Sequence, residues 1–260
     1  MDMGKKNLKK IMGLALAGAM VMGMMTACGS SSSKKNSDTL VMATNATFPP
    51  YESVSGDDIV GIDVDIANAI AKKLGKKLKI EDVSFDSIIA GVQNDKYDFG
   101  MAGMTVTDER KKNVDFTESY AKAVQVVIVK EDSDIKSIDD ISSKNKIGVQ
   151  QGTTGDIYAS DTVENGGYGE DAVTKYNSGP DAVQALLSDK VDCVIIDNEP
   201  AKAYVAANQG LKILDSSFAD EEYAICVKKG NSQLKNDINK ALKELKDDGT
   251  IDKIVSKYIK

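Results

Sequence analysis

Strand-like and helix-like segments alternate along residues 39–260, and this alternation constrains the fold more than any other feature of the chain. Short apolar runs typical of buried strands are separated by segments whose apolar residues recur at helical spacing, as in Ile62, Ile66, Ile70 and Leu74. Such alternation predicts parallel sheets covered by helices. We expect strands at 40–44, 78–83, 97–102, 146–150, 191–197 and 223–227, and helices at 62–74, 85–92, 152 onward, 180–187, 199–207, 232 onward and 251–259.

A short pattern occurs twice along the chain, with an offset of 94 residues. In both copies a predicted helix ends in Asp-Lys-x-Asp and leads into a strand. The matching positions are Ile89, Val92, Asp95, Lys96 and Asp98 in the first copy and Val183, Leu186, Asp189, Lys190 and Asp192 in the second. Two lobes of similar topology would explain the repeat, and chance similarity between two helix–strand units is the alternative. In two such lobes a ligand would bind between the carboxyl ends of the strands.

The N-terminal segment reads as an export signal rather than as part of the fold. Four lysines between residues 5 and 10 precede an uncharged, mostly apolar run at 11–25, which is shorter than the roughly 20 residues of a spanning helix. The run ends in Met25-Thr26-Ala27-Cys28, which resembles a bacterial lipobox whose Cys28 is lipidated. We expect a lipoprotein signal peptide at 1–27 and a lipidated Cys with a flexible tether at 28–37. An ordinary secretory signal that ends near a Cys is the alternative.

The ionisable residues exclude several functions. The chain has 33 Lys+Arg, 40 Asp+Glu and no His, for a net charge of −7. Without an imidazole there is no Ser-His-Asp triad, no Cys-His pair and no His-ligated zinc, and the acidic balance argues against nucleic acid. Without residues 1–27 the chain keeps 29 basic and 39 acidic residues, and this net charge of −10 gives no sign of a lipid-binding face. We see no metal-ligand cluster and expect no cofactor.

Two cysteines remain in the body of the chain. Cys193 and Cys226 both lie inside apolar runs. An exported pair of this kind could form a disulfide. Free buried thiols are the alternative, and the sequence leaves the choice open.

Arg110 is the single arginine of a chain that otherwise uses lysine, and it follows the predicted strand at 97–102. A guanidinium matches a carboxylate with two parallel hydrogen bonds, which an ammonium cannot do. We therefore interpret Arg110 as a clamp for an anionic group. The alternative is a surface arginine paired with Asp108 or Glu109.

Two further polar positions follow predicted strands. Gln150 leads into Gly152, Thr153 and Thr154 at a helix start, where backbone N–H groups suit a carboxylate or a phosphate. An ordinary threonine N-cap is the alternative. Asp197 ends the run at 191–197, where its carboxylate could face a cleft and pair with an ammonium. A helix cap before Pro200 is the alternative for Asp197.

Aromatic residues complete the set of candidate binding residues. Phe48 lies in the stretch Phe48-Pro49-Pro50-Tyr51, and Phe85 begins a predicted helix. Both suggest rigid walls of a binding site, with core packing as the alternative. An anion clamp at Arg110, a cation partner at Asp197 and aromatic walls together describe recognition of a free amino acid.

At these positions the sequence resembles the extracytoplasmic solute-binding proteins of amino-acid ABC importers, the polar-amino-acid family. The resemblance extends from about Thr39 to Lys260. It rests on five stretches in the family's order: Ala43-Thr44-Asn45-Ala46-Thr47-Phe48-Pro49-Pro50-Tyr51, Gly61-Ile62-Asp63-Val64-Asp65-Ile66, Ala102-Gly103-Met104-Thr105-Val106-Thr107-Asp108-Glu109-Arg110, Gly152-Thr153-Thr154 and Ile196-Asp197-Asn198-Glu199-Pro200.

The resemblance implies contacts to both charged groups of an amino acid. Arg110 and the amides of Thr105 and Thr154 would bind the α-carboxylate. Asp197, the Gly103 carbonyl and the Thr105 hydroxyl would bind the α-ammonium.

The resemblance also implies which residues surround the ligand's side chain. Phe48 and Phe85 would flank it, Ala102 and Thr153 would line the cleft, and selectivity would come from Asn45 and Gln150. Some relatives that take Lys or Arg have an Asp at the Asn45 position, so Asn45 weakens the case for a cationic ligand without excluding one. If Glu52 or Glu199 faces the pocket, its carboxylate would favour a cationic ligand.

The implied fold is α/β, with two Rossmann-like lobes joined by a two-strand hinge, the type II fold of periplasmic binding proteins. Lobe one would comprise 38–119 and 225–260, lobe two 125–219, and the hinge strands would lie near 120–124 and 220–224. The implied mechanism is closure of the lobes on the ligand and docking on a membrane permease. We expect a monomer outside the cell membrane, held there only by its lipid anchor.

Two other functions remain open. One is an enzyme on the same scaffold, such as a small-acid dehydratase or a carboxylate-driven glycosidase, in which Asp and Glu pairs act without His. The other is a ligand-sensing domain, which would need a spanning helix or signalling module that we do not find after residue 38.

Overall fold

The structure, a computed structural model, describes residues 38–215 and 217–259. The predicted signal peptide, the lipidated Cys28 and the tether lie outside the described residues.

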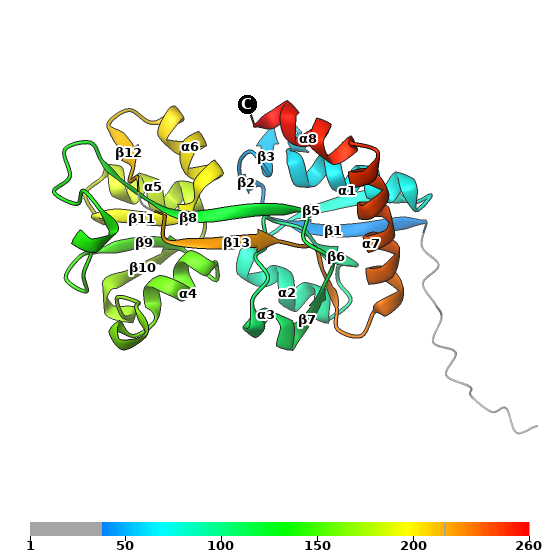
Figure 1. Cartoon of the computed structure of the whole chain (residues 1–260), viewed down its shortest axis with the longest axis horizontal. Coiled ribbons are helices and arrows are strands. Elements are labelled where there is room, and N and C mark those ends of the chain that lie inside the picture. The colour runs from blue at the N-terminus through cyan, green and yellow to red at the C-terminus, as the bar shows by residue number, and fades with distance from the viewer. Residues whose placement is uncertain (1–37, 216, 260) are drawn as a thin grey trace, which may run out of the picture. The chain divides into compact units, whose positions relative to one another are not determined.

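The first lobe contains a five-stranded mixed sheet covered by helices on both faces (Figure 1). Three parallel strands at one side continue into two that pair in antiparallel fashion, in the order β5 (Lys77–Asp82), β1 (Thr39–Thr44), β6 (Phe99–Gly100), β14 (Cys226–Lys228) and β7 (Val114–Phe116). One face packs on α1 (Ile62–Lys73), α7 (Ser232–Asp247) and α8 (Thr250–Tyr258), and the other on α2 (Phe85–Gln93) and α3 (Asp108–Asn113).

The second lobe repeats this strand order. Its sheet runs β10 (Val173–Tyr176), β9 (Ile147–Gln150), β11 (Cys193–Asp197), β8 (Ala121–Lys130) and β12 (Leu211–Ile213). The helices are α5 (Gly179–Leu187) and α6 (Asn198–Ala207) on one face and α4 (Thr154–Ser160) on the other, with short 3-10 helices at Ile138–Asp140, Val163–Asn165 and Glu170–Ala172.

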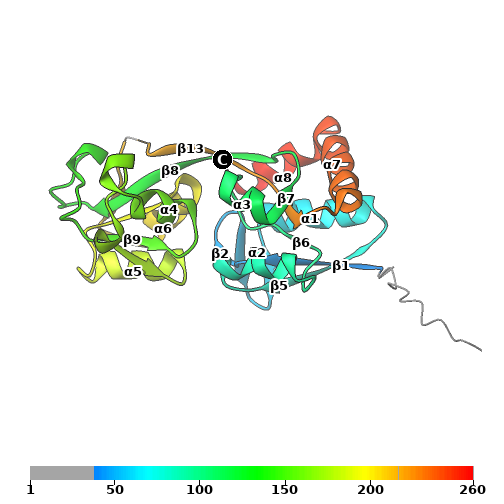
Figure 2. The same cartoon turned by 90° about the horizontal axis from the view of Figure 1, so that it is seen from below.

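Two paired strands connect the lobes. The strand β13 (Ala219–Tyr223) pairs in antiparallel register with the first half of β8, from Ala219 opposite Gln125 to Tyr223 opposite Ala121. Figures 1 and 2 show β8 and β13 side by side between the two groups of helices. The predicted fold class, two α/β lobes joined by a two-strand hinge, is therefore confirmed.

The sequence repeat corresponds to a structural repeat at the end of α2 and of α5. Asp95 and Asp189 both have a φ of 57°, in the left-handed region that a non-glycine residue seldom adopts. Asp98 accepts a hydrogen bond from the Val41 amide at 2.7 Å, and Asp192 accepts one from the Lys146 amide at 2.8 Å. In each lobe this carboxylate ties the turn after the helix to the first strand, so similar topology rather than chance explains the repeat.

The core follows the alternation of side chains along the strands. In β11, Cys193 and Ile195 pack on the α4 side, whereas Val194 and Ile196 pack on the side of α5 and α6. Cys193 and Cys226 are both free and buried in different hydrophobic clusters. Burial raises the pKa of each thiol to about 12, which makes both unreactive.

Several segments differ from the sequence prediction, which named no element at α3, β7, β10 or β12. The strand expected at 97–102 is reduced to β6, and the Tyr97 ring before it packs against Gly91 of α2. The strand expected at 223–227 is divided between β13 and β14. A three-stranded antiparallel sheet, which the sequence did not predict, follows β1 and consists of β2 (Thr47–Phe48), β3 (Glu52–Ser55) and β4 (Asp58–Val60).

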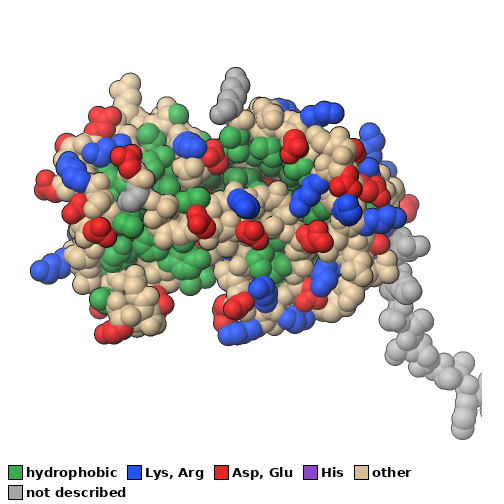
Figure 3. Space-filling view, viewed as in Figure 1, with side chains coloured by type: hydrophobic (Ala, Val, Ile, Leu, Met, Phe, Trp, Pro, Cys, Tyr) green, Lys and Arg blue, Asp and Glu red, His purple; other side chains and the backbone are tan. Residues whose placement is uncertain are grey.

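The surface carries charges of both signs. On the face shown in Figure 3, basic and acidic side chains are interspersed rather than gathered in separate patches. In residues 38–215 and 217–259 we find no helix long and apolar enough to cross a membrane.

Candidate functional site

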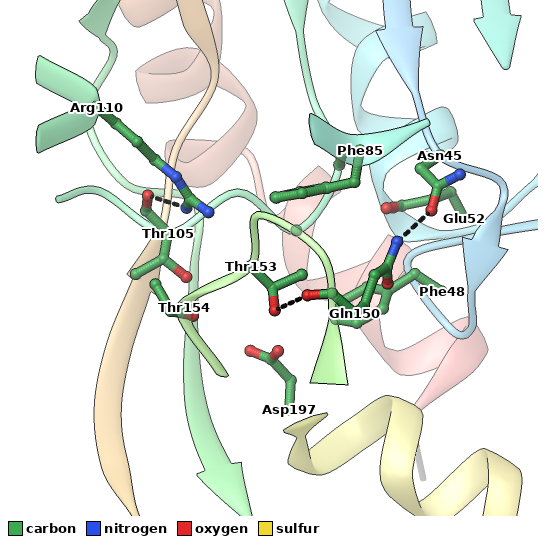
Figure 4. A pocket seen from close by; sticks show the side chains of 12 residues that line it. Asn45, Phe48, Glu52, Phe85, Thr105, Arg110, Gln150, Thr153, Thr154 and Asp197 are labelled. Carbon is green, nitrogen blue, oxygen red and sulfur yellow. Dashed lines mark hydrogen bonds between the residues drawn. The ribbon is translucent and has the colours of Figure 1, made fainter. Parts of the chain in front are cut away.

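One pocket between the lobes is lined by all eleven residues that the sequence and the family resemblance predicted as ligand contacts (Figure 4). The cavity left between these side chains has a volume of about 10 Å³, room for about one water molecule, so an amino acid can bind only when the lobes move apart. Several of these residues directly follow the carboxyl ends of parallel strands, as expected for an open α/β sheet. The lining residues are Asn45, Phe48, Glu52, Phe85, Ala102, Gly103, Thr105, Arg110, Gln150, Thr153, Thr154 and Asp197.

Arg110 is buried at one end of this pocket rather than exposed on the surface. Its side chain donates to the Thr105 carbonyl at 2.7 Å and to the Gly152 carbonyl at 3.0 Å, and its guanidinium lies 5.3 Å from the centre of the Phe85 ring. The surface alternative is wrong, because Lys111 and Lys112 rather than Arg110 pair with Asp108 and Glu109. Two carbonyls use two of the five guanidinium N–H groups, so the others remain for an anion.

Asp197 lies across the pocket from Arg110 (Figure 4). It occupies the N-cap position of α6, but its side chain makes no cap hydrogen bond. Its carboxylate instead accepts from Gln125 at 2.8 Å and from the Tyr223 hydroxyl, so the cap alternative is wrong. Burial and the neighbouring carboxylate of Glu221 raise the pKa of Asp197 to about 8. A cation is the partner that would stabilise its ionised form.

The stretch at 152–154 begins α4 and lines the pocket at the same time. The Thr153 hydroxyl accepts from the Asp156 amide at 3.3 Å, as the N-cap alternative predicted. The Gly152 amide donates to Asp156 at 2.9 Å. The cap therefore holds the turn, and Thr153 and Thr154 still face the pocket.

Aromatic and small residues form the walls. Phe48 is 7% exposed and packs against Gly103, whose φ is 53° and where an added Cβ would lie 2.7 Å from the ring. The Gly103 amide donates to Asp63 at 2.8 Å, which fixes the peptide next to Ala102. Tyr51 packs edge-on against Tyr223 and does not line the pocket.

Asn45 and Gln150 meet across the pocket from different lobes. Gln150 donates to the Asn45 side-chain oxygen at 2.8 Å (Figure 4), and Asn45 donates to the Val83 carbonyl at 2.9 Å. The same Asn45 oxygen also accepts from Thr47 at 2.9 Å. Asn45 is thus held so that its oxygen, an acceptor, points toward the pocket.

Glu52 lines the pocket beside Asn45, at the end far from Arg110 (Figure 4). Its side chain is fully buried, and neither carboxyl oxygen accepts a hydrogen bond from a donor group in the described part of the chain. Burial first, and then the nearby carboxylate of Asp63, raise its pKa well above the usual range.

From the sequence, Glu52 and Glu199 were both conditional candidates for the pocket. The structure places Glu52 in the pocket and Glu199 outside it, against Lys202 at 2.7 Å. In the sequence, Glu52 directly follows the aromatic stretch at 48–51. The pairing of β2 with β3 turns this stretch and Glu52 toward the cleft. No group of three or more potential metal-ligating side chains occurs within residues 38–215 and 217–259.

Two α/β lobes, paired connecting strands and a polar pocket between the lobes define a bilobal solute-binding protein. The chain belongs to the bacterial extracellular solute-binding proteins, family 3, whose pattern matches residues 40–260. The family resemblance found in the sequence is therefore confirmed.

Individual relatives support this assignment. The arginine-binding extracellular protein ArtP of Bacillus subtilis is 36% identical over 250 residues, which cover 94% of this chain and 96% of ArtP. A solved ancestral arginine-binding protein with bound arginine is 44% identical, with a TM-score of 0.80 over 86% of this chain and 99% of that one. The same identity and a TM-score of 0.78 relate this chain to an ancestral arginine-binding protein bound to glutamine, over 85% of this chain and 98% of that one.

Proposed function

We propose that this protein captures a free α-amino acid outside the cell membrane and delivers it to the permease of an ABC importer. The observation that carries the proposal is the placement of Arg110 and Asp197 at one pocket, with the guanidinium and the carboxylate facing the same space. A zwitterion has one group for each of them.

Arg110 and the amides of Thr105 and Thr154 are the proposed contacts of the α-carboxylate. The carbonyl of Thr105 already holds the guanidinium in place, at 2.7 Å. Asp197, the Gly103 carbonyl and the Thr105 hydroxyl are the proposed contacts of the α-ammonium. Charge-assisted hydrogen bonds of this kind are each worth about 1.5–3 kcal/mol.

We further propose that the ligand's side chain carries a positive charge. The side chain would pass between Phe48 and Phe85 and along Ala102 and Thr153 to the end lined by Asn45, Gln150 and Glu52. Glu52 supplies an unpartnered buried carboxyl there, and Asp63 and Asp82 add negative charge nearby. The names of ArtP and of the ancestral protein, both arginine-binding, agree with this choice.

Closure of the lobes would complete the site. Side-chain hydrogen bonds already join the lobes across the pocket: Gln150 to Asn45 at 2.8 Å, Gln151 to Asp86 at 3.0 Å, and Arg110 to the Gly152 carbonyl at 3.0 Å. The proposed lobes are 38–119 with 225–260 and 125–219, with hinge strands near 120–124 and 220–224. A ligand that contacts both lobes shifts the equilibrium toward this closed arrangement.

The proposal includes export and anchoring. Residues 1–27 would direct export, and a lipidated Cys28 would hold the monomeric protein at the membrane through the tether at 28–37. We favour binding over an enzyme or a sensor because the relatives described above are named as binding proteins.

A thermal-shift panel of the twenty amino acids and cystine tests the proposal. A ligand stabilises the folded state by RT ln(1 + [L]/Kd), so a tight ligand stands out. We expect the largest shift with arginine and smaller shifts with lysine and glutamine. No shift with any amino acid would refute the proposal, and a shift only with acidic or aliphatic amino acids would refute the charge assignment.

A further inference from the structure

A second buried carboxylate lies behind the proposed α-ammonium site. Glu221 is on the hinge strand β13 and is 6% exposed. One of its oxygens accepts from the Thr105 hydroxyl at 2.9 Å and from Gln125 at 3.1 Å. Glu221 itself does not line the pocket, so any effect on a ligand passes through Thr105 or Gln125.

Gln125 connects Glu221 with Asp197. This fully buried side chain, on the hinge strand β8, donates to Asp197 at 2.8 Å as well as to Glu221. The two carboxyl groups therefore both accept from one amide nitrogen, which places them close together. Each hinge strand thus contributes one side chain beside Asp197, Gln125 from β8 and Glu221 from β13.

The hydrogen on the Thr105 hydroxyl is already used. A hydroxyl has one hydrogen to donate, and here the acceptor is Glu221. The lone pairs of the hydroxyl oxygen can still accept hydrogen bonds, but the hydroxyl has no second hydrogen to donate. Toward the pocket, Thr105 and Asp197 therefore both present acceptors.

We propose that Glu221 is a positioning residue that makes this end of the pocket select an ammonium over an uncharged hydroxyl group. The inference rests on the proposed amino-acid function. A hydroxyl can donate only one hydrogen bond and carries no charge to offset two facing carboxyl groups, whereas an ammonium donates three. In the ligand-free protein a proton on Asp197 takes the place of that charge.

The charged and titratable side chains around Asp197 and Glu221 are consistent with this role of Glu221. Arg110 of α3 is the nearby cation, and burial lowers its pKa while the charges of Glu221 and Asp197 oppose that shift. Tyr158 of α4 faces Glu221, and burial together with this carboxylate raises the pKa of its hydroxyl to about 12. Tyr223 donates to Asp197 from the other side. Lys111 and Lys122 line the outer cavity that Glu221 and Tyr158 also border, whereas Arg110 is the cation that lines the ligand pocket with Asp197.

The test compares Glu221→Gln with Glu222→Gln in the full chain. Glu222 is the next residue of the same strand but is exposed, so the two variants remove the same charge from opposite faces of β13. Calorimetry would measure the affinity for L-arginine and for argininic acid, in which a hydroxyl replaces the α-amine. We expect Glu221→Gln to reduce the preference for arginine by about tenfold and Glu222→Gln to leave it unchanged. Glu221→Met, of similar length and also without charge, takes its place if Glu221→Gln does not fold, and should show the same loss.

A second measurement needs no ligand. Thermal unfolding of the ligand-free protein between pH 5 and pH 8.5 should show a smaller loss of stability with rising pH for Glu221→Gln than for Glu222→Gln, because only Glu221 opposes ionisation of Asp197. Equal selectivity and equal pH profiles in the two variants would overturn the inference. If the wild type bound no amino acid, the proposed function would fail, and the pH profiles alone would decide whether Glu221 and Asp197 form the pair.

Discussion

The Arg110 guanidinium of the first lobe donates a hydrogen bond to the Gly152 carbonyl of the second lobe, at 3.0 Å. The residue proposed to hold the ligand's carboxylate is therefore also one that holds the two lobes together. A ligand bound to Arg110 would sit directly at the contact between the lobes, which links binding to closure.

Replacement of Arg110 by lysine should greatly weaken ligand binding. Lysine keeps the charge but loses the planar fork that can hold a carboxylate while it donates to Thr105 and Gly152. We expect a loss of about 10- to 100-fold in affinity for L-arginine, measured by calorimetry. A melting curve that matches wild type would show that the fold is intact. Affinity within about twofold of wild type would rule out the proposed carboxylate site.

Glu52→Gln should change which amino acid is preferred. The substitution removes the unpartnered carboxyl at the end of the pocket but keeps its volume and polarity. We expect affinity for L-arginine to fall by about tenfold or more, with a much smaller change for L-glutamine. Glu199→Gln is the matched control, because Glu199 pairs with Lys202 outside the pocket and should leave both affinities unchanged. Equal losses for both amino acids would argue against a cationic ligand.

The ligand-free protein should lose stability as the pH rises, in part through Asp63. Burial raises the pKa of Asp63 to about 6 from a usual value of 3.8, so the folded state binds more protons than the unfolded state between these values. Its contribution is present below pH 4 and is lost as the pH rises through about 6. Asp63→Asn should flatten this part of the profile in chemical denaturation, and Asp57→Asn, on the exposed loop of the β3–β4 hairpin, should not. A profile for Asp63→Asn as steep as wild type would contradict the assignment.

Gly152→Ala should impair closure. At Gly152 φ is 76° and an added Cβ would lie 3.1 Å from the Asp86 Cβ of the other lobe. We expect weaker ligand binding and less ligand-induced compaction in X-ray scattering. Gly166→Ala carries similar strain, with φ at 92°, but its Cβ would meet no atom within 4 Å, so it should lower stability without affecting compaction. Similar scattering for the two variants would show that this contact does not limit closure.

Cys28→Ser should release the protein from the membrane. The substituted residue has no thiol to receive a lipid, and two acyl chains are what makes such anchoring stable. Fractionation of cells that produce each form should find the wild type with membranes and the variant in the soluble, extracytoplasmic fraction. Continued membrane association of the variant would contradict the lipoprotein assignment.

The sequence by itself determined the fold class and most of the pocket. Helical and strand periodicity gave the order of elements, since each side chain's face follows from its spacing along the chain. The Asp-Lys-x-Asp repeat indicated two similar lobes, and strand-end positions such as Asn45, Gln150 and Asp197 became pocket residues because parallel strands present their carboxyl ends at one edge. Local spacing is sufficient for the order of elements and for positions such as Asp197, whereas Asn45, Ala102, Gly103 and Thr105 were implied by the family resemblance.

Only the tertiary structure decided which polar groups meet. Glu221 lies 116 residues from Thr105 and 96 from Gln125, and no local pattern indicates that these side chains share hydrogen bonds. Glu52 and Glu199 looked alike as candidates, and pairing of β2 with β3 placed only Glu52 in the cleft. Such contacts depend on how the hinge strands pair and on how the lobes meet, and these are properties of the whole packed chain rather than of any segment.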